Sequence, residues 1–232
     1  AIRCITAEGE RDIVVRGLTI GETIGRPLQV HNLIPKAQRF ERVLELMERV
    51  GLDPNWVNKY PHELDGGRRQ RIGIARALSL QPDFIVCDEP VSALDVSIQA
   101  QIINLLKKLQ NDMGLTYVFI SHDLSVVEHI SDTVGVMYLG NMVELGSSNT
   151  IFAEPLHPYT EALLDAIPTT EEASNKALHT IEGDIPSPVN PPSGCKFHTR
   201  CKYATDRCRQ ETPQLKDMGN GHLVACFAVE GK

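Results

Sequence analysis

The sequence has 232 residues, of which 42% are hydrophobic and 23% are charged, and its formal net charge is −7 at pH 7. A chain of this length can bury a substantial core, and its acidic balance excludes a general nucleic-acid binder, which needs a basic face. No apolar run reaches the roughly 18 residues needed to cross a bilayer, and residues 1–12 lack the apolar segment of a secretion signal. Because the sequence starts without Met and in irregular sequence, we expect residue 1 to be an interior position of a longer protein.

Helices and short strands are expected to alternate along the first two-thirds of the chain. Apolar residues at helical spacing predict helices over residues 37–50, 66–80, 96–113, 124–130 and 159–166. Short apolar runs bounded by turn residues predict strands over residues 84–87, 115–121, 133–139 and 142–145. A Gly140-Asn141 turn joins the last two strands as a hairpin. The alternation predicts an α/β fold with a mainly parallel sheet covered by helices on both faces.

The character of the sequence changes after Gly146. A polar stretch and the Pro-rich passage Ile185–Ser193 are typical of a stiff connector. Four of the six cysteines then crowd into the last part of the chain, at Cys195, Cys201, Cys208 and Cys226. Their clustering predicts a local module at the C-terminal end.

Two acids follow the apolar strand predicted at residues 84–87. Asp88 and Glu89 would leave the carboxyl end of that strand side by side. One carboxylate can hold Mg²⁺ through water while its neighbour polarises an attacking water molecule, which is the arrangement that nucleotide hydrolysis needs. The alternative interpretation is that the two acids only cap a buried strand.

A glycine pair, Gly66-Gly67, opens the helix predicted at residues 66–80. The free N–H groups of the first turn and the positive end of the helix dipole favour a bound phosphate. The segment alone fits equally well a Gly-Gly turn before an Arg-rich, solvated helix.

Four segments together resemble the motifs of ABC ATPases, in the order in which that family has them. Leu64–Arg71 resembles the signature motif, Phe84–Glu89 the Walker B strand with its catalytic Glu, Ser92–Asp95 the D-loop, and Ile120–Asp123 the segment of the switch histidine. The resemblance runs from Thr19 to Gly146 and implies an ABC-type nucleotide-hydrolysing core with a helical subdomain. It also implies ATP and Mg²⁺ as the cofactors.

The resemblance assigns a role to each matching residue. Asp88 would hold the Mg²⁺ shell, Glu89 would activate water, and His122 would contact the γ-phosphate of ATP. In this family two nucleotide domains face each other, so the signature of one chain covers the ATP that the other chain holds. The residues implied in that shared site are Asp65, Gly66, Gly67, Arg68, Ser92 and Asp95.

The sequence departs from the family pattern in two ways, and the first departure lies in the signature segment. Asp65 stands where the usual signature has Ser, and Arg68 stands where it commonly has Gln. A carboxylate 4 Å from a γ-phosphate would repel it by up to about 4 kcal/mol at an effective dielectric constant near 20. Neutralisation by Arg68 or Arg69 would relieve this repulsion, and the sequence leaves open whether the signature serves a fully active or a weaker site.

The second departure is that no Gly-x-x-x-x-Gly-Lys-Ser/Thr phosphate loop occurs in the sequence; the segment 21–27 has neither the spacing nor the Lys. We therefore expect the chain alone to hydrolyse ATP negligibly, although a longer version would be active.

The cysteine tail, together with His157–Thr160 and Asn190–Gly194, resembles the C-terminal extension of ABC ATPases that serve oligopeptide and dipeptide importers. The implied substrate is a peptide, or less often nickel or another small solute. In relatives with four such cysteines the implied occupant is an iron–sulfur cluster. The resemblance therefore favours a [4Fe–4S] cluster, which all-thiolate ligation allows, and the absence of the C-x2-C pairs of zinc ribbons makes zinc the weaker alternative. Two disulfides and four unconnected thiols also stay open for these cysteines.

The resemblance also implies partners, a location and a division of the chain. The direct partners would be a second ABC ATPase subunit, identical or different, and two transmembrane permease subunits. An extracytoplasmic peptide-binding protein would be an indirect partner, and no nucleic acid is expected to bind. The protein would lie peripherally on the cytoplasmic face of a prokaryotic cell membrane. The expected parts are a truncated ATPase domain (1–153, with a helical subdomain at 17–80 and a catalytic core at 81–153), a connector (154–194) and a four-cysteine module (195–232).

Two rival interpretations remain. An ABC-type ATPase can also work outside transport, in DNA repair or translation, although this sequence shows no inserted coiled coil and no tandem domain. The chain can also be a non-enzymatic interaction fragment with a metal-binding tail.

Overall fold

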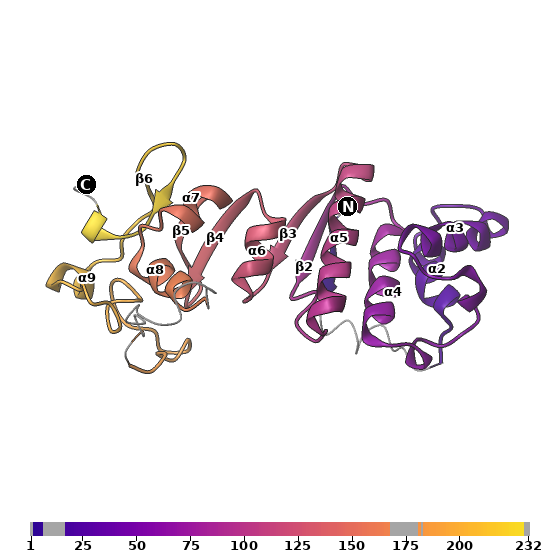
Figure 1. Ribbon diagram of the computed structural model, residues 1–232, viewed down its shortest axis with the longest axis horizontal. Coiled ribbons are helices and arrows are strands. Elements are labelled where there is room, and N and C mark those ends of the chain that lie inside the picture. The colour runs from indigo at the N-terminus through magenta and orange to yellow at the C-terminus, as the bar shows by residue number, and fades with distance from the viewer. Residues whose placement is uncertain (1, 7–16, 168–180, 182, 230–232) are drawn as a thin grey trace. The chain divides into compact units, whose positions relative to one another are not determined.

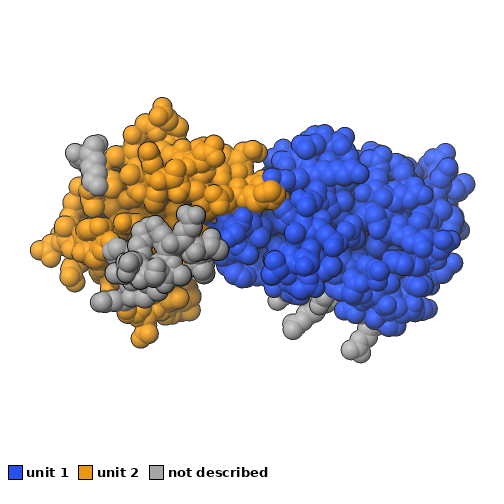
Figure 2. All heavy atoms as spheres, viewed as in Figure 1, with its two compact units in different colours: residues 1–126 blue, residues 127–232 orange. Residues whose placement is uncertain are grey.

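The computed structural model describes residues 2–6, 17–167, 181 and 183–229 of the chain. The chain divides into two compact units, Ala1–Val126 and Val127–Lys232, which Figure 2 shows in blue and orange. Figure 1 labels the helices and strands of both units.

Unit 1 contains a three-stranded parallel sheet. The strands β1 (Ile2–Thr6), β2 (Phe84–Asp88) and β3 (Thr116–Ile120) lie in the order β1-β2-β3. In the register of the central pair, Phe84 lies beside Thr116 and Asp88 lies beside Ile120. The carboxyl ends of the strands therefore meet at one edge of the sheet, where ligands bind in open α/β folds.

The helix α5 (Val96–Met113) connects β2 to β3 and coincides with the predicted helix. Ile102, Leu106 and Leu109 share a buried face of this helix, as the i, i+4, i+7 spacing requires. Gly114 ends it with a positive φ of 64°, a conformation that glycine adopts without a steric penalty.

Three further helices of unit 1 pack on one another: α2 (Ile20–Val30), α3 (Lys36–Arg49) and α4 (Gly66–Leu78) (Figure 1). Short 3₁₀ turns at Pro54–Trp56 and Pro61–Glu63 join α3 to α4. The helices α3 and α4 confirm the sequence prediction, whereas α2 was not predicted. Their common core contains the fully buried side chains Ile20, Ile24, Leu46, Met47, Ile72 and Leu78.

Unit 2 contains a second sheet, in which every strand pair is antiparallel. The strands β4 (Thr133–Tyr138), β5 (Asn141–Ser147), β6 (Lys216–Asp217) and β7 (Leu223–Val224) lie in the order β4-β5-β7-β6. The expectation of a mainly parallel sheet therefore holds only for the first sheet. The hairpin turn consists of Leu139 and Gly140, one residue earlier than the predicted Gly140-Asn141 turn, because Asn141 already pairs with Tyr138 as the first residue of β5. Leu139 and Gly140 both have positive φ, so the chain reverses directly into β5 without the crossover that a parallel pair needs.

The remaining helices are short: α6 (Leu124–Ile130), α7 (Ser148–Ala153), α8 (Pro158–Asp165), α9 (Asp206–Gln210) and the 3₁₀ turn Phe227–Val229. In unit 2, Phe197 from the cysteine tail packs edge-on against Tyr138 of β4, with ring centroids 5.2 Å apart. Tyr159 of α8 joins the same aromatic cluster. The tail is thus anchored on the β4–β5 hairpin. Across the described helices, none combines the length and the apolar character that crossing a membrane requires.

Candidate functional site

The two acids predicted to carry chemistry lie at the carboxyl end of β2. Asp88 is the last residue of the strand and is exposed, while the buried residues Ile85 and Cys87 hold the strand in the core. Glu89 follows with a positive φ of 45°, and its N–H donates to the carbonyl of Ile120 at 2.9 Å. This bond fixes the residue after β2 to the end of β3, so the turn that presents Glu89 is held by the sheet itself.

His122, two residues beyond β3, contacts the side chain of Glu89. Its Nδ1 atom lies 3.0 Å from Glu89 Oε1, although the two residues are 33 positions apart in sequence. Both side chains reach solvent, with 44% of Glu89 and 72% of His122 exposed. The hydrogen bond from His122, its charge and a smaller contribution from Ser92 hold the pKa of Glu89 below its ordinary value. Glu89 is therefore an ionised, accessible carboxylate at neutral pH, as a general base must be.

The predicted signature segment forms the start of α4. Gly66 and Gly67 supply the first two N–H groups of this helix, which have no partner within a helix. Asp65 is the N-cap: its Oδ1 accepts the N–H of Arg68 at 2.9 Å, and its Oδ2 lies 2.8 Å from Arg68 Nη1. A side chain at Gly67 would place its Cβ 2.5 Å from Ile98 Cγ2, so only glycine allows this approach to α5.

The predicted D-loop lies between β2 and α5. Ser92 is exposed and its hydroxyl donates to the carbonyl of Glu89 at 3.3 Å, while Asp95 caps α5 by accepting the N–H of Ile98 at 3.0 Å. Gln99, which no sequence motif singled out, donates its amide to the carbonyls of Val91 and Leu94, both at 3.1 Å. The loop is therefore held to its own helix by hydrogen bonds at both ends.

The four cysteines of the tail come close to one another within unit 2. All are free thiols, with Cys208 buried and Cys195, Cys201 and Cys226 half-buried. Burial raises the pKa of Cys201 to about 11, and charge on the other three thiols raises it further. Burial and neighbouring thiols likewise raise the pKa of Cys195 and Cys226. Within the described ranges, however, no three His, Cys, Asp or Glu side chains are arranged to hold a metal ion.

A buried polar cluster, not predicted from the sequence, joins this tail to the second sheet. Glu144 of β5 is fully buried and accepts the N–H groups of Leu156 at 2.7 Å and His157 at 3.1 Å. Its Oε1 also lies 2.7 Å from Nε2 of His222, which precedes β7. Burial lowers the pKa of His157 to about 4, so this imidazole is neutral at pH 7, and its Nδ1 accepts the N–H of Tyr159. Three segments of unit 2 that are distant in sequence therefore meet at one carboxylate.

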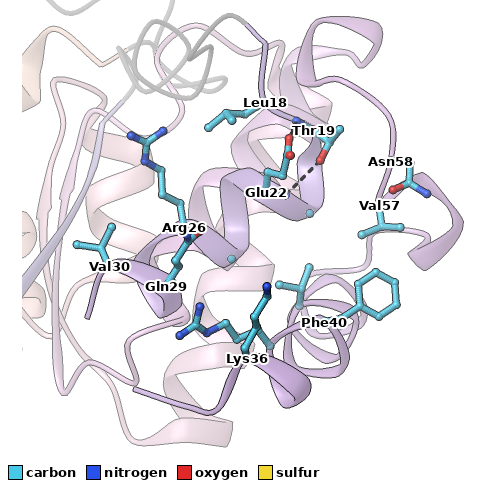
Figure 3. Close-up of a pocket in the computed structure, with 14 residues that line it drawn as sticks. Leu18, Thr19, Glu22, Arg26, Gln29, Val30, Lys36, Phe40, Val57 and Asn58 are labelled. Atoms are coloured by element: carbon cyan, nitrogen blue, oxygen red, sulfur yellow. Dashed lines mark hydrogen bonds between the residues drawn. The ribbon is translucent and has the colours of Figure 1, made fainter. Parts of the chain in front are cut away.

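A groove of about 870 Å³ runs between α2 and α3 in unit 1 (Figure 3). Its lining combines the apolar surface of Phe40, 60% exposed, with the cationic side chains of Arg26 and Lys36. Gly21 faces the segment after α3 so closely that a Cβ would lie 2.6 Å from Val57 Cγ2. The glycine in α2 thus lets the helix pack tightly while the groove beside it stays open.

Comparison with known proteins places these features in one family. The family model for ABC transporters matches residues 5–92, and the model described as "Oligopeptide/dipeptide transporter, C-terminal region" matches residues 143–208. The first match contains the signature and Walker B segments, and the second contains three of the four tail cysteines.

Curated relatives and a solved structure agree with these matches. The oligopeptide transport ATP-binding protein AppF of Bacillus subtilis is 54% identical over 210 residues, which cover 90% of this chain and 64% of AppF. OppF of Haemophilus influenzae is 53% identical over 215 residues, covering 91% of this chain and 65% of OppF. The structure of cbiO1 from Clostridium perfringens, part of the ABC transporter complex cbiONQ, aligns with a TM-score of 0.59 at 25% identity over 66% of this chain and 59% of that chain. The chain spans less than two-thirds of the length of these curated relatives. The family models and the relatives together show that it belongs to the family of ATP-binding subunits of oligopeptide ABC transporters.

Proposed function

We propose that the protein containing this chain hydrolyses ATP to drive the import of oligopeptides or dipeptides across the cytoplasmic membrane of a prokaryote. The observation that carries the proposal is the contact between Glu89 and His122 at the carboxyl edge of the parallel sheet. Relatives at 53–54% identity are oligopeptide transport ATP-binding proteins by name, which supports the choice of a peptide as the substrate.

The hydrolytic step would use the residues at the edge of the first sheet. Glu89 would accept a proton from the water that attacks the γ-phosphate, and its hydrogen bond with His122 would keep its carboxylate aimed at that water. His122 is exposed enough to contact the γ-phosphate as well. Asp88 would hold Mg²⁺ through water, and the bound ion would neutralise phosphate charge.

The signature would act on ATP held by a facing subunit. The N–H groups of Gly66 and Gly67 would donate to the γ-phosphate, as helix N-termini commonly do. Ser92 and Asp95 lie in the loop that would pass between the two sites. Because the sequence has no phosphate loop, we also propose that residues 1–232 alone hydrolyse ATP negligibly.

The groove of Figure 3 is the candidate binding surface for a permease subunit. A short amphipathic helix could place apolar side chains against Phe40 and acidic side chains near Arg26 and Lys36. The mixture of apolar and basic side chains in the groove lining suits an amphipathic segment of this kind.

The substitution Phe40→Asp is expected to separate this subunit from the permease and to reduce peptide uptake at least about tenfold, because it places a charge at the centre of an apolar contact. Uptake of a labelled tripeptide into proteoliposomes that contain the complete transporter measures the effect. Leu33→Asp is the matched control, since Leu33 is 53% exposed and lies outside the groove lining. Equal uptake by both variants would contradict the assigned groove, and ATP-independent uptake by the wild type would contradict the proposed function.

We also propose that the four tail cysteines hold a [4Fe–4S] cluster. The described side chains are not arranged to hold a metal ion as they stand, so donor chemistry supports this proposal. All four are free, at least half-buried thiols within electrostatic range of one another, and an all-thiolate donor set suits iron–sulfur chemistry. Cys195, Cys201, Cys208 and Cys226 would be the ligands. When bound, the cluster would join four separate points of the tail and so stabilise its few short elements.

Anaerobically purified complete protein is expected to contain about four iron and four acid-labile sulfide ions per chain. The substitution Cys201→Ser should remove most of this iron, because a cluster with three thiolates is weakly held. Cys4→Ser, which changes a cysteine outside the tail, should leave it in place. A colourless protein with one zinc ion per chain would refute the cluster.

A further inference from the structure

We propose that Asp65 and Arg68 form a charge-compensated signature, in which the guanidinium of Arg68 makes the side-chain contact to the γ-phosphate that a serine hydroxyl makes in the usual motif. This inference rests on the proposed function and specifies how this variant signature serves it. The sequence alone leaves open whether an acid at residue 65 makes the site defective.

The carboxylate of Asp65 is fully engaged at the start of α4. Its Oδ1 accepts the backbone N–H of Arg68 at 2.9 Å, and its Oδ2 pairs with Arg68 Nη1 at 2.8 Å. Both oxygens therefore bind donors of the same residue, and the pair has no net charge. An incoming phosphate would meet this pair rather than an isolated carboxylate.

The neighbouring arginine does not take part. Arg69 donates from Nε to the carbonyl of Pro61 at 3.1 Å and from Nη2 to the carbonyl of His62 at 3.4 Å. Its guanidinium thus serves the 3₁₀ turn that precedes α4. Of the two candidate counter-ions for Asp65, the structure selects Arg68.

Arg68 is both held in place and accessible. Its guanidinium carbon lies 4.9 Å from the centroid of the Trp56 ring, a distance typical of a cation–π contact. Half of its side chain nevertheless remains exposed. A guanidinium has five N–H donors, so donors remain for a phosphate after the pair with Asp65 is made.

The two positions are therefore expected to depend on each other. With Arg68 in place, Asp65 is neutralised and the phosphate gains a cationic donor. Without Arg68, Asp65 would be an uncompensated anion at the helix N-terminus that phosphate must approach. Serine at residue 65 with glutamine at residue 68, the usual pair of the family, would remove both charges together.

A double-mutant cycle in the complete, assembled transporter tests this dependence through the KM for ATP and the kcat. Arg68→Gln alone is expected to raise the KM about tenfold, whereas Asp65→Ser alone should leave it within about twofold of wild type. The double variant should return close to wild type, and Arg68→Lys should recover part of the loss because it keeps the charge. Serine is itself a good N-cap, so each variant is expected to fold, and its thermal unfolding midpoint checks this.

Arg69→Gln is the matched control, expected to leave the KM unchanged because Arg69 binds backbone carbonyls. An unchanged KM in Arg68→Gln, or a double variant no better than Arg68→Gln, would overturn the inference while leaving the proposed function intact. A wild-type transporter without ATP turnover would instead refute the proposed function, and this inference with it.

Discussion

Replacing Glu89 by Gln is expected to lower the kcat for ATP hydrolysis by about 10²–10⁴-fold, with little change in the KM for ATP. The amide has nearly the shape of the carboxylate and can still contact His122, but it cannot accept the proton of the attacking water. The base is lost while the binding surface is kept. Phosphate release by the assembled transporter measures the effect.

The control for this prediction is Glu41→Gln, which removes the charge of an exposed glutamate on α3. Wild-type turnover is expected for this variant, because α3 lies apart from the edge of the sheet that presents Glu89. If Glu89→Gln kept more than about a tenth of the wild-type kcat, water activation by Glu89 would be wrong.

Replacing Glu144 by Ala is expected to destabilise unit 2 by about 3–5 kcal/mol, the usual effect of removing one partner from a buried pair. The variant leaves the N–H groups of Leu156 and His157 and the ring of His222 without their common partner. The two histidines are buried, so their polar groups cannot turn to water instead. Urea unfolding and hydrogen exchange of the β5 and β7 amides measure the loss.

Two controls locate this effect in unit 2. Glu144→Gln should lose clearly less stability, since the amide oxygen can still accept a hydrogen bond. The single tryptophan of the chain, Trp56, lies in unit 1, so its fluorescence should report little change in either variant. A loss below about 1 kcal/mol in Glu144→Ala would mean that the cluster does not hold the tail to the sheet.

The sequence predicted best those features that depend on local patterns. The helix at Val96–Met113 was predicted with its observed bounds, because a regular apolar face lies between an Asp N-cap and a terminal Gly. The helix α2 was missed because Gly21, Gly25 and Pro27 lower its helix propensity. Tertiary packing overrides that propensity through the buried Ile20 and Ile24, and the only local signal was the capping box of Thr19 with Glu22.

Contacts between distant residues were predictable only where topology dictates them. Neighbouring parallel strands place their carboxyl ends together, so the meeting of Glu89 with His122 could be expected from the two strands alone. The contact between Glu144 and His222 joins residues 78 positions apart. It depends on the antiparallel pairing of β5 with β7, which no sequence pattern predicted. Whether Asp65 pairs with Arg68 or with Arg69 depends on side-chain conformation, so this ion pair also could not be predicted from the sequence.

The proposed mechanism depends on a carboxylate at residue 89 that drives hydrolysis of ATP held between two subunits. The most direct measurement is the identity of the nucleotide retained by the Glu89→Gln transporter after incubation with Mg²⁺ and ATP and removal of free nucleotide. Unhydrolysed ATP should be recovered in the complex, because the variant keeps the binding surface and lacks the base. Recovery of ADP, with phosphate released at the wild-type rate, would contradict this mechanism.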